Sequence, residues 1–188
     1  AFSAVGSVGP IINVLIGLFM GLSTGAGAVI SQFFGARHTD RVQDAVHTAV
    51  AMTLALGVVF TFLGLAFTPS MLRLMKMPEN VFPHALTYLR IYFAGTIANL
   101  LFNVGSGILR AVGDSKTPLV AMVVAAITNI ALDILAVFVL KWGIAGAAAA
   151  TDGYFADGFS TVYKSQTGAA QVFLHGGEEG VQSLLGDF

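Results

Sequence analysis

Long apolar stretches, separated by short polar segments, run through the first 150 positions of the chain. A helix needs about 20 mostly apolar residues to cross a hydrocarbon core roughly 30 Å thick. Four windows meet this length, at about residues 10–34, 46–67, 83–109 and 117–140, while a fifth apolar run, 142–150, is too short to span alone. The pattern therefore predicts an all-α, polytopic membrane helix bundle with at least four spanning helices before residue 151.

The ends of these windows carry residues typical of helix boundaries and turns. Pro10 suits a first helical turn, where the N–H that proline lacks would have no partner. Thr117-Pro118 predicts a helix start at the fourth window, and Gly113 and Asp114 form the turn before it. Residues 71–76 mix apolar and basic side chains, which predicts a turn or two at the membrane interface. We therefore expect short connections between the helices.

Composition and charge narrow the possible functions. Hydrophobic residues make up 56% of the 188 positions and charged residues 10%, with a mean hydropathy of +0.82, whereas soluble domains carry about 25% charged residues. The net charge of -1 shows no excess of basic residues of the kind that binds nucleic acid. The absence of cysteine excludes disulfides and thiolate metal sites. Without a catalytic triad, paired carboxylates or a Walker loop, we predict neither an enzyme nor a metal protein.

The chain begins at Ala1 with no cationic segment before its first apolar stretch. We therefore expect a piece of a longer protein, without a signal peptide at this end. After Thr151 the composition changes: 152–188 hold one lysine, five acidic residues and seven glycines. Such a segment has too little apolar surface to offset the entropy of ordering. We predict a transmembrane segment, 1–151, followed by a Gly-rich acidic tail, 152–188, that lacks a transmembrane helix and is poorly packed.

The first window carries Gly17, Gly21 and Gly25, spaced by four residues along one helix face. Small residues at this spacing let another backbone approach closely in lipid, where packing drives helix association. We interpret the three glycines as a helix-packing face. A face that slides against a neighbour during a transport cycle is the alternative, and the pattern does not separate the two.

Polar side chains form a stripe along the third window: Tyr88, Tyr92, Thr96, Asn99 and Asn103. Unsatisfied amides are costly in hydrocarbon, so this stripe should face protein or water. Hydrogen bonding between helices and the lining of an aqueous cavity both explain it. Because Tyr88 and Asn103 are 15 residues apart, about 22 Å along a helix, they cannot both touch one small ion.

Asp133 lies inside the fourth window with apolar residues on both sides. A charge near the centre of a bilayer costs about 2.5–3.5 kcal/mol, so its carboxylate should face a partner or a water-filled site. Asn129, one turn earlier on the same face, offers another oxygen. The pair predicts a site for a hard monovalent cation, or for a proton because burial favours the neutral carboxyl. A structural aspartate bonded to a neighbouring helix is the alternative.

From about Val5 to Thr151 the chain resembles the MATE family, the multidrug and toxic compound extrusion transporters. The segments that carry the resemblance are 8–13 (VGPIIN), 31–36 (SQFFGA), 88–92 (YLRIY), 108–118 (ILRAVGDSKTP), 129–133 (NIALD) and 146–151 (GAAAAT). Their combination and order are specific, although each segment alone is weak. The match places the windows as the family's second to fifth helices, followed by the start of the sixth.

This resemblance implies a transporter with twelve helices in two lobes, which exports drugs or organic cations in exchange for Na⁺ or H⁺. It implies a cation or proton site that includes Asn129, Asp133 and Thr151, with Tyr88 and Asn103 in the surrounding network. The family's first-helix aspartate, which completes the site, has no counterpart in this chain. The implied surroundings are the lipid bilayer, a second lobe and a multi-pass location in a bacterial inner membrane. No cofactor beyond the coupling ion is expected.

The first and third connections carry Arg37, Arg41, Arg110 and Lys116, which slightly favours a cytoplasmic location for them, as the resemblance also implies. The resemblance stops abruptly after Thr151. A one-nucleotide shift of suitable codons for residues 153–160 reads as a typical sixth-helix opening, so we hypothesise an out-of-frame tail. A divergent natural terminus is the alternative. For function, the alternatives are a lipid-linked saccharide flippase of similar lobe plan and a non-transporting membrane fragment.

Overall fold

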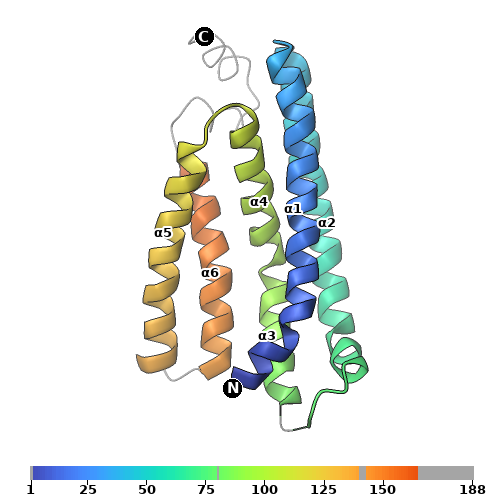
Figure 1. Cartoon of the computed structure of the whole chain (residues 1–188), viewed down its shortest axis with the longest axis vertical. Coiled ribbons are helices and arrows are strands. Elements are labelled where there is room, and N and C mark those ends of the chain that lie inside the picture. The colour runs from blue at the N-terminus through green and yellow to red at the C-terminus, as the bar shows by residue number, and fades with distance from the viewer. Residues whose placement is uncertain (1, 80, 140–142, 165–188) are drawn as a thin grey trace.

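The computed structural model describes residues 2–79, 81–139 and 143–164, and every regular element in these ranges is a helix (Figure 1). The elements are α1 (Phe2–Gly35), α2 (Thr39–Leu74), α3 (Phe82–Ala94), α4 (Thr96–Ala111), α5 (Lys116–Asp133), the π-helical segment η1 (Ile134–Val139) and α6 (Gly143–Lys164). Three helices are long and apolar enough to cross a membrane, and α3 with α4 makes a fourth, bent span. The predicted all-α membrane bundle is confirmed.

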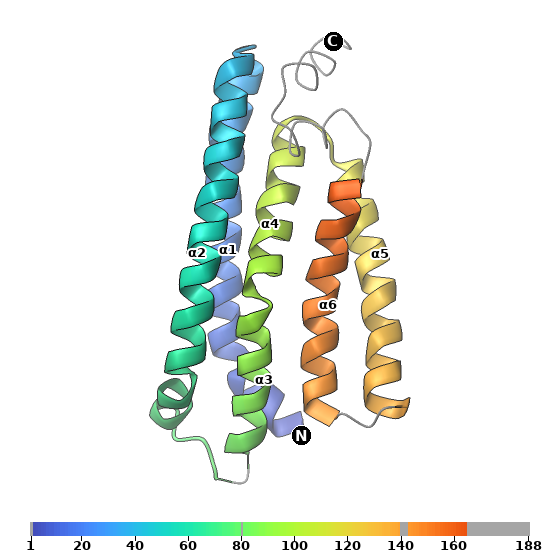
Figure 2. The same cartoon turned by 180° about the vertical axis from the view of Figure 1, so that it is seen from behind.

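The helices form two pairs on either side of a central column. Figures 1 and 2 show α1 beside α2 and α5 beside α6, with α3 and α4 between the pairs. Helix α4 contacts α1, α2 and α6, while α3 contacts α2 and α6. Leu89, Leu100 and Ile108 in this column are fully buried. The polar stripe therefore lies on the two helices at the centre of the bundle, α3 and α4.

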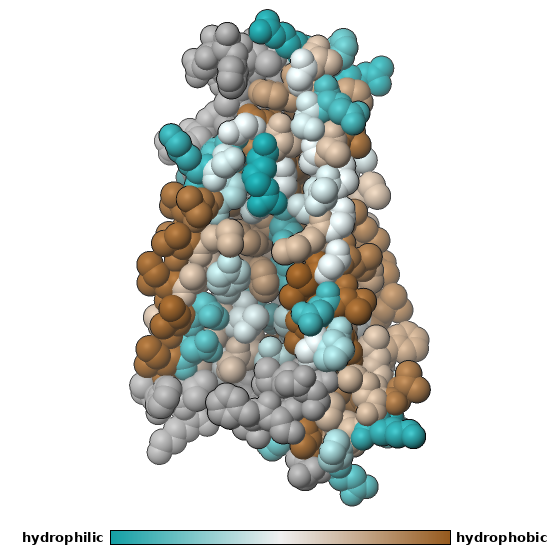
Figure 3. Space-filling model, viewed as in Figure 1, coloured by the Kyte–Doolittle hydropathy of each residue, from teal (hydrophilic) through white to brown (hydrophobic). Residues whose placement is uncertain are grey.

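Large apolar side chains remain exposed on the two outer helices. Phe62 on α2 is 70% exposed and Ile127 on α5 is 64% exposed, and many of their neighbours on these helices are similar. Figure 3 shows hydrophobic side chains along both flanks and hydrophilic ones towards the ends. Soluble monomers rarely expose apolar patches of this extent. A lipid environment solvates these faces, because there is no cost in placing apolar side chains against acyl chains.

Several helices extend beyond the predicted windows. Helix α1 begins at Phe2, so the prediction that Pro10 occupies a first turn is wrong, and Pro10 lies inside the helix. Helix α2 continues to Leu74, so residues 71–74 prolong a spanning helix instead of forming a separate interfacial turn. Only the following residues reverse direction, where Lys76 has a φ of 51°. A window chosen by hydropathy ends at the first charged residue. The backbone hydrogen bonds of a helix are not interrupted by a charged side chain, so the helix continues beyond the window.

The turn between α4 and α5 forms at the predicted residues with a different cap. Gly113 has a φ of 90°, the left-handed conformation that glycine adopts without strain after a helix. The carboxylate oxygen Oδ1 of Asp114 accepts hydrogen bonds of 3.0 Å from the backbone N–H groups of Lys116 and Thr117. Asp114, not Thr117, therefore caps the free amides at the start of α5.

The third predicted helix is broken where one continuous helix was expected. Helices α3 and α4 meet at Gly95 with a bend of 48°. The side-chain carboxylate of Asp152 on α6 lies directly against Gly95, in the space that a Cβ atom would occupy. Glycine permits this close approach to the backbone. The bend thus occurs where the central column contacts α6.

Helix α6 overturns the prediction for the first part of the tail. It runs from Gly143 to Lys164 and crosses the predicted boundary after Thr151. The ring of Phe102 on α4 packs over Gly158 and lies 6.0 Å from the ring of Tyr154. The prediction of a poorly packed segment is therefore wrong for 152–164, since tertiary contacts stabilise a helix that composition alone does not favour. Residues 165–188 lie outside the described residues.

Candidate functional site

The polar stripe faces the interior of the bundle, as predicted. Tyr88, Tyr92, Thr96 and Asn99 are buried, and Asn103 is half-buried. All five come from α3 and α4, whose contacts with α1, α2 and α6 cover this face. The stripe is therefore shielded from lipid, and its amides and hydroxyls must find partners within the protein or in a water-filled space.

The part of the stripe from Tyr92 to Asn103 forms a hydrogen-bonded network. The amide Nδ2 of Asn103 donates to Oδ1 of Asn99 at 2.7 Å and to its backbone oxygen at 2.9 Å. Asn99 in turn donates to the hydroxyl of Tyr92 at 3.4 Å. Ser23 on α1 donates to the backbone oxygen of Asn103 at 2.6 Å. The Ser23 bond joins α1 to α4 and the Asn99 bond joins α4 to α3, so this region shows the hydrogen bonding between helices that was one of the two predicted roles.

Asp133 occupies a break in helical geometry. Helix α5 ends at Asp133 and the π-helical segment η1 begins at the next residue. The expected regular helix therefore changes type at Ile134, and its predicted end at Leu140 lies outside the described residues. Segments of π-helix occur often at functional sites, since they re-aim side chains.

The Asp133 carboxylate lacks the partner that a purely structural role would require. Its atom Oδ1 is buried and has no hydrogen-bond partner among the residues that the structure describes. A buried polar atom left unpaired is costly, so this one is available to a proton, an ion or a water molecule. Asn129, half-buried, lies one turn away on the same face.

Tyr88 on α3 interacts with residues of two other helices. The hydroxyl of Tyr88 on α3 forms a side-chain hydrogen bond with Thr151 on α6, and it lies within electrostatic range of Asp133. Tyr88 thus relates two of the other predicted residues, Thr151 on α6 and Asp133 on α5. Asn103 does not join them, because its amide is bonded to Asn99. The expectation that Tyr88 and Asn103 serve different places agrees with this geometry.

Asp152 is the residue at this site that sequence reasoning missed. Its carboxylate lies directly against the backbone at Gly95 and within electrostatic range of Tyr88 and Tyr92. The sequence placed Asp152 in the disordered tail. A signal was present, since a glycine inside an apolar helix often marks a close approach by another group.

The predicted residues and those related to them through Tyr88 comprise two carboxylates and several neutral oxygens. Asp133 and Asp152 supply the carboxylates, while Tyr88, Thr151 and Asn129 supply two hydroxyls and an amide oxygen. Such ligands suit a hard cation or a shared proton. Within 2–79, 81–139 and 143–164, no cluster of three or more histidine or acidic side chains could hold a metal ion.

A cavity of about 410 Å³ borders the stripe between α1, α4, α5 and α6. Its polar lining includes Asn99, Asn103, Ser106 and Arg110, and its aromatic lining includes Phe102. Ser106 is buried, and its hydroxyl has no hydrogen-bond partner among the described residues. Sequence reasoning missed Ser106, although it continues the stripe three residues after Asn103. The stripe therefore has a hydrogen-bonded part and a part that lines a cavity.

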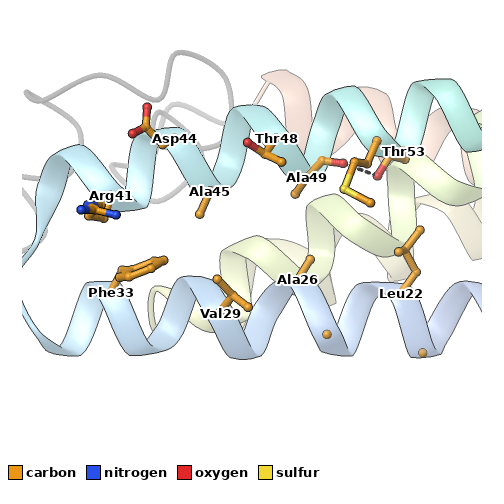
Figure 4. Close-up of a pocket in the computed structure, with 13 residues that line it drawn as sticks. Leu22, Ala26, Val29, Phe33, Arg41, Asp44, Ala45, Thr48, Ala49 and Thr53 are labelled. Atoms are coloured by element: carbon orange, nitrogen blue, oxygen red, sulfur yellow. Dashed lines mark hydrogen bonds between the residues drawn. The ribbon is translucent and has the colours of Figure 1, made fainter.

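A larger groove, of about 480 Å³, lies between α1 and α2 (Figure 4). It is lined by Gly21 and Gly25, and none of the predicted ion-site residues lines it. At Gly17, Gly21 and Gly25 a Cβ atom would meet nothing within 4 Å. The described helices therefore leave this face open, and its packing role stays a prediction.

Comparisons with known proteins agree with one another. A family model described as MatE matches residues 1–135. The "Probable multidrug resistance protein YoeA" of Bacillus subtilis is 38% identical over 157 residues, which cover 80% of this chain and 34% of that protein. YpnP of the same organism, also named a probable multidrug resistance protein, is 33% identical over 151 residues, with the same coverage. The chain thus spans about a third of the length of these relatives.

Solved structures show the same fold. A multidrug resistance MATE family transporter in an inward-facing conformation matches with a TM-score of 0.83 and 28% identity, covering 97% of this chain and 43% of that one. An outward-facing conformation matches with a TM-score of 0.81 and 27% identity, covering 97% of this chain and 45% of the other. The helix arrangement of the chain is therefore shared by both conformations.

Proposed function

The chain belongs to the MatE family, and we propose that it forms most of the amino-terminal lobe of an antiporter that exports drugs or organic cations in exchange for Na⁺ or H⁺. The relatives named as multidrug resistance proteins support a drug efflux transporter. The apolar helices agree with a multi-pass membrane protein, and we propose a bacterial inner membrane as its location. Membership of a transporter family indicates no enzymatic activity.

The unpaired Asp133 carboxylate is the observation that carries the proposed coupling. Its buried Oδ1 atom has no described partner. Tyr88 on α3, which bonds to Thr151 on α6, lies within electrostatic range of it. An ionisable group kept in the membrane without a structural partner is expected to bind a proton or an ion during function. The coupling site thus joins α3, α5 and α6, and ion binding would alter their contacts.

The cavity beside the polar stripe supplies a route for substrate. Ser106 offers a free hydroxyl, Phe102 offers an aromatic surface, and Asn103 adds an amide. Pockets that bind small organic molecules combine apolar walls with a few polar groups in this way. Because the cavity and the coupling group touch the same central column, ion binding and substrate binding can influence each other.

The match to both inward- and outward-facing transporters supports movement as a rigid body. This segment matches the two conformations about equally well, with TM-scores of 0.83 and 0.81, as expected if the helices move together. Alternating access then arises when this lobe rocks against a second body around a shared site. That second body is the other lobe, which lies in the two thirds of the relatives that this chain does not cover.

The flippase alternative receives no support from the names of the relatives. A flippase of lipid-linked saccharides would favour a strongly cationic cavity. Arg110 is the single basic residue among those lining the cavity beside the stripe. The other alternative, a membrane fragment that does not transport, is tested by reconstituting this chain alone and measuring transport.

We expect the 188-residue chain alone to show no ion-driven ethidium efflux from proteoliposomes, because one lobe cannot rock against a missing partner. The complete transporter that contains this segment, reconstituted at the same density, should show efflux that depends on a sodium or proton gradient. Dye fluorescence measures both. Gradient-driven efflux by the chain alone would contradict the two-lobe mechanism, and its absence in the complete protein would contradict the proposed function.

A further inference from the structure

The groove between α1 and α2 has one polar end and one apolar end. Arg41 lies at one end beside Phe33, with Asp44 near it on the side of α2 that faces away from α1, and Leu22 and Thr53 lie at the other end (Figure 4). Arg41 is two residues after the first residue of α2, so the polar end coincides with the end of the helix pair. In a membrane this end lies at the surface, and the apolar end lies within the hydrocarbon.

The length of the groove matches one leaflet of a bilayer. Its lining on α2 runs from Arg41 to Thr53, and its lining on α1 runs from Phe33 back to Gly21. Each stretch covers 12 residue steps, about 18 Å at 1.5 Å per residue. One leaflet contributes about 15 Å of a roughly 30 Å hydrocarbon core. A docked transmembrane helix would instead need a contact surface through both leaflets.

The floor of the groove is open to an acyl chain. A Cβ atom at Gly21 or Gly25 would meet nothing within 4 Å. Val29 is 47% exposed and Met52 is 52% exposed, so the walls also face outward. The volume of about 480 Å³ falls within the range of cavities that bind small molecules. An apolar chain can therefore enter from the side without displacing any described side chain.

The charged end points to the chemistry of the headgroup. Arg41 and Asp44 are three residues apart on one helix face, and both are exposed. A guanidinium binds phosphate with paired hydrogen bonds, and a carboxylate accepts hydrogen bonds from a primary ammonium. A zwitterionic headgroup with a phosphate and an ammonium satisfies both, whereas an anionic headgroup would be repelled by Asp44.

We propose that this groove binds one phosphatidylethanolamine-type lipid, with its phosphate on Arg41, its ammonium on Asp44 and an acyl chain over Gly21 and Gly25. Phosphatidylcholine fits less well because its quaternary ammonium cannot donate a hydrogen bond to Asp44. Phosphatidylglycerol fits less well because it lacks the ammonium. The site is separate from the group around Asp133 and does not depend on the transport mechanism.

Native mass spectrometry of the full chain in mild detergent tests the site, with the three lipids titrated separately. We expect one phosphatidylethanolamine to bind at least about tenfold more tightly than phosphatidylglycerol, a difference of about 1.4 kcal/mol. Gly25→Leu fills the groove and should weaken this binding about tenfold. Gly17→Leu is the matched control, since it adds the same side chain at an equally open glycine that does not line the groove.

The headgroup contacts are tested independently of the groove floor. Asp44→Asn should reduce the preference for phosphatidylethanolamine over phosphatidylcholine, and Arg41→Gln should weaken the binding of both. Circular dichroism confirms that each variant keeps its helices. The proposal is overturned if all three lipids bind equally to the wild type, or if Gly17→Leu and Gly25→Leu have the same effect. The last outcome would assign the glycine face to a protein helix.

Discussion

Asp133→Asn, made in the complete transporter that contains this segment, should lower ion-driven dye efflux by about tenfold or more, equivalent to about 1.4 kcal/mol. The substitution keeps the size of the side chain and removes the ionisable group. The buried Oδ1 atom has no described hydrogen-bond partner, so folding should be nearly unaffected. Dye efflux under separate sodium and pH gradients, with expression as the check on folding, measures the effect.

Asn129→Ala is the graded comparison for this experiment. It removes an amide dipole one turn from Asp133 instead of a charge, so we expect a smaller loss of the same coupling. A variant with Asn at position 133 that transports normally across both gradients would make Asp133 a structural residue. A loss of expression equal to the loss of efflux would lead to the same conclusion.

Gly107→Leu should lower the free energy of unfolding by roughly 1–3 kcal/mol or more, because there is no space for a side chain at this crossing. A Cβ atom at Gly107 would collide with Ser23 on α1, whose backbone oxygen would lie 3.0 Å away. A Cβ atom at Gly27 would in turn lie 3.3 Å from the backbone oxygen of Gly107. Helices α1 and α4 therefore meet backbone to backbone, as small residues allow in membranes.

Unfolding of the chain in mixed detergent micelles, followed by circular dichroism, measures this loss. Gly17→Leu serves as the control because a Cβ atom there meets nothing within 4 Å, and it should unfold close to the wild type. Equal destabilisation by both substitutions would show that loss of glycine, and not the crossing, governs the effect. Unchanged stability of Gly107→Leu would contradict the close approach of α1 and α4.

These two expectations concern different properties of one lobe. In the proposed mechanism, a rigid lobe needs tight helix crossings such as that at Gly107, since it would transmit a local change at the proposed ion site to the whole body. The ion site needs the opposite, an unpaired group that responds to a proton or an ion. The structure separates the two: the crossing joins α1 to α4, and the open carboxylate lies where α5 changes to η1.

The sequence by itself determined the class of the protein and the directions in which its helices face. Apolar length and low charge are properties of contiguous segments, and a membrane leaves the backbone little choice except helix. The position of the polar stripe from Tyr88 to Asn103 predicted which face of α3 and α4 is buried, because unsatisfied amides are excluded from lipid. Asp133 could be singled out from the sequence on similar grounds, because a charged side chain inside an apolar segment is costly in a membrane.

Only the tertiary structure decided what depends on contacts between distant segments. The bend at Gly95 accompanies the approach of Asp152, a residue 57 positions later. Helix α6 persists to Lys164 because it packs on α4 and α5, although its composition suggested disorder. On α1, the close glycine contact is that of Gly27 with Gly107 on α4, whereas Cβ atoms at Gly17, Gly21 and Gly25 would meet nothing within 4 Å. Local pattern specifies which segments become helices, whereas packing specifies where they bend, how far they continue and which side chains meet.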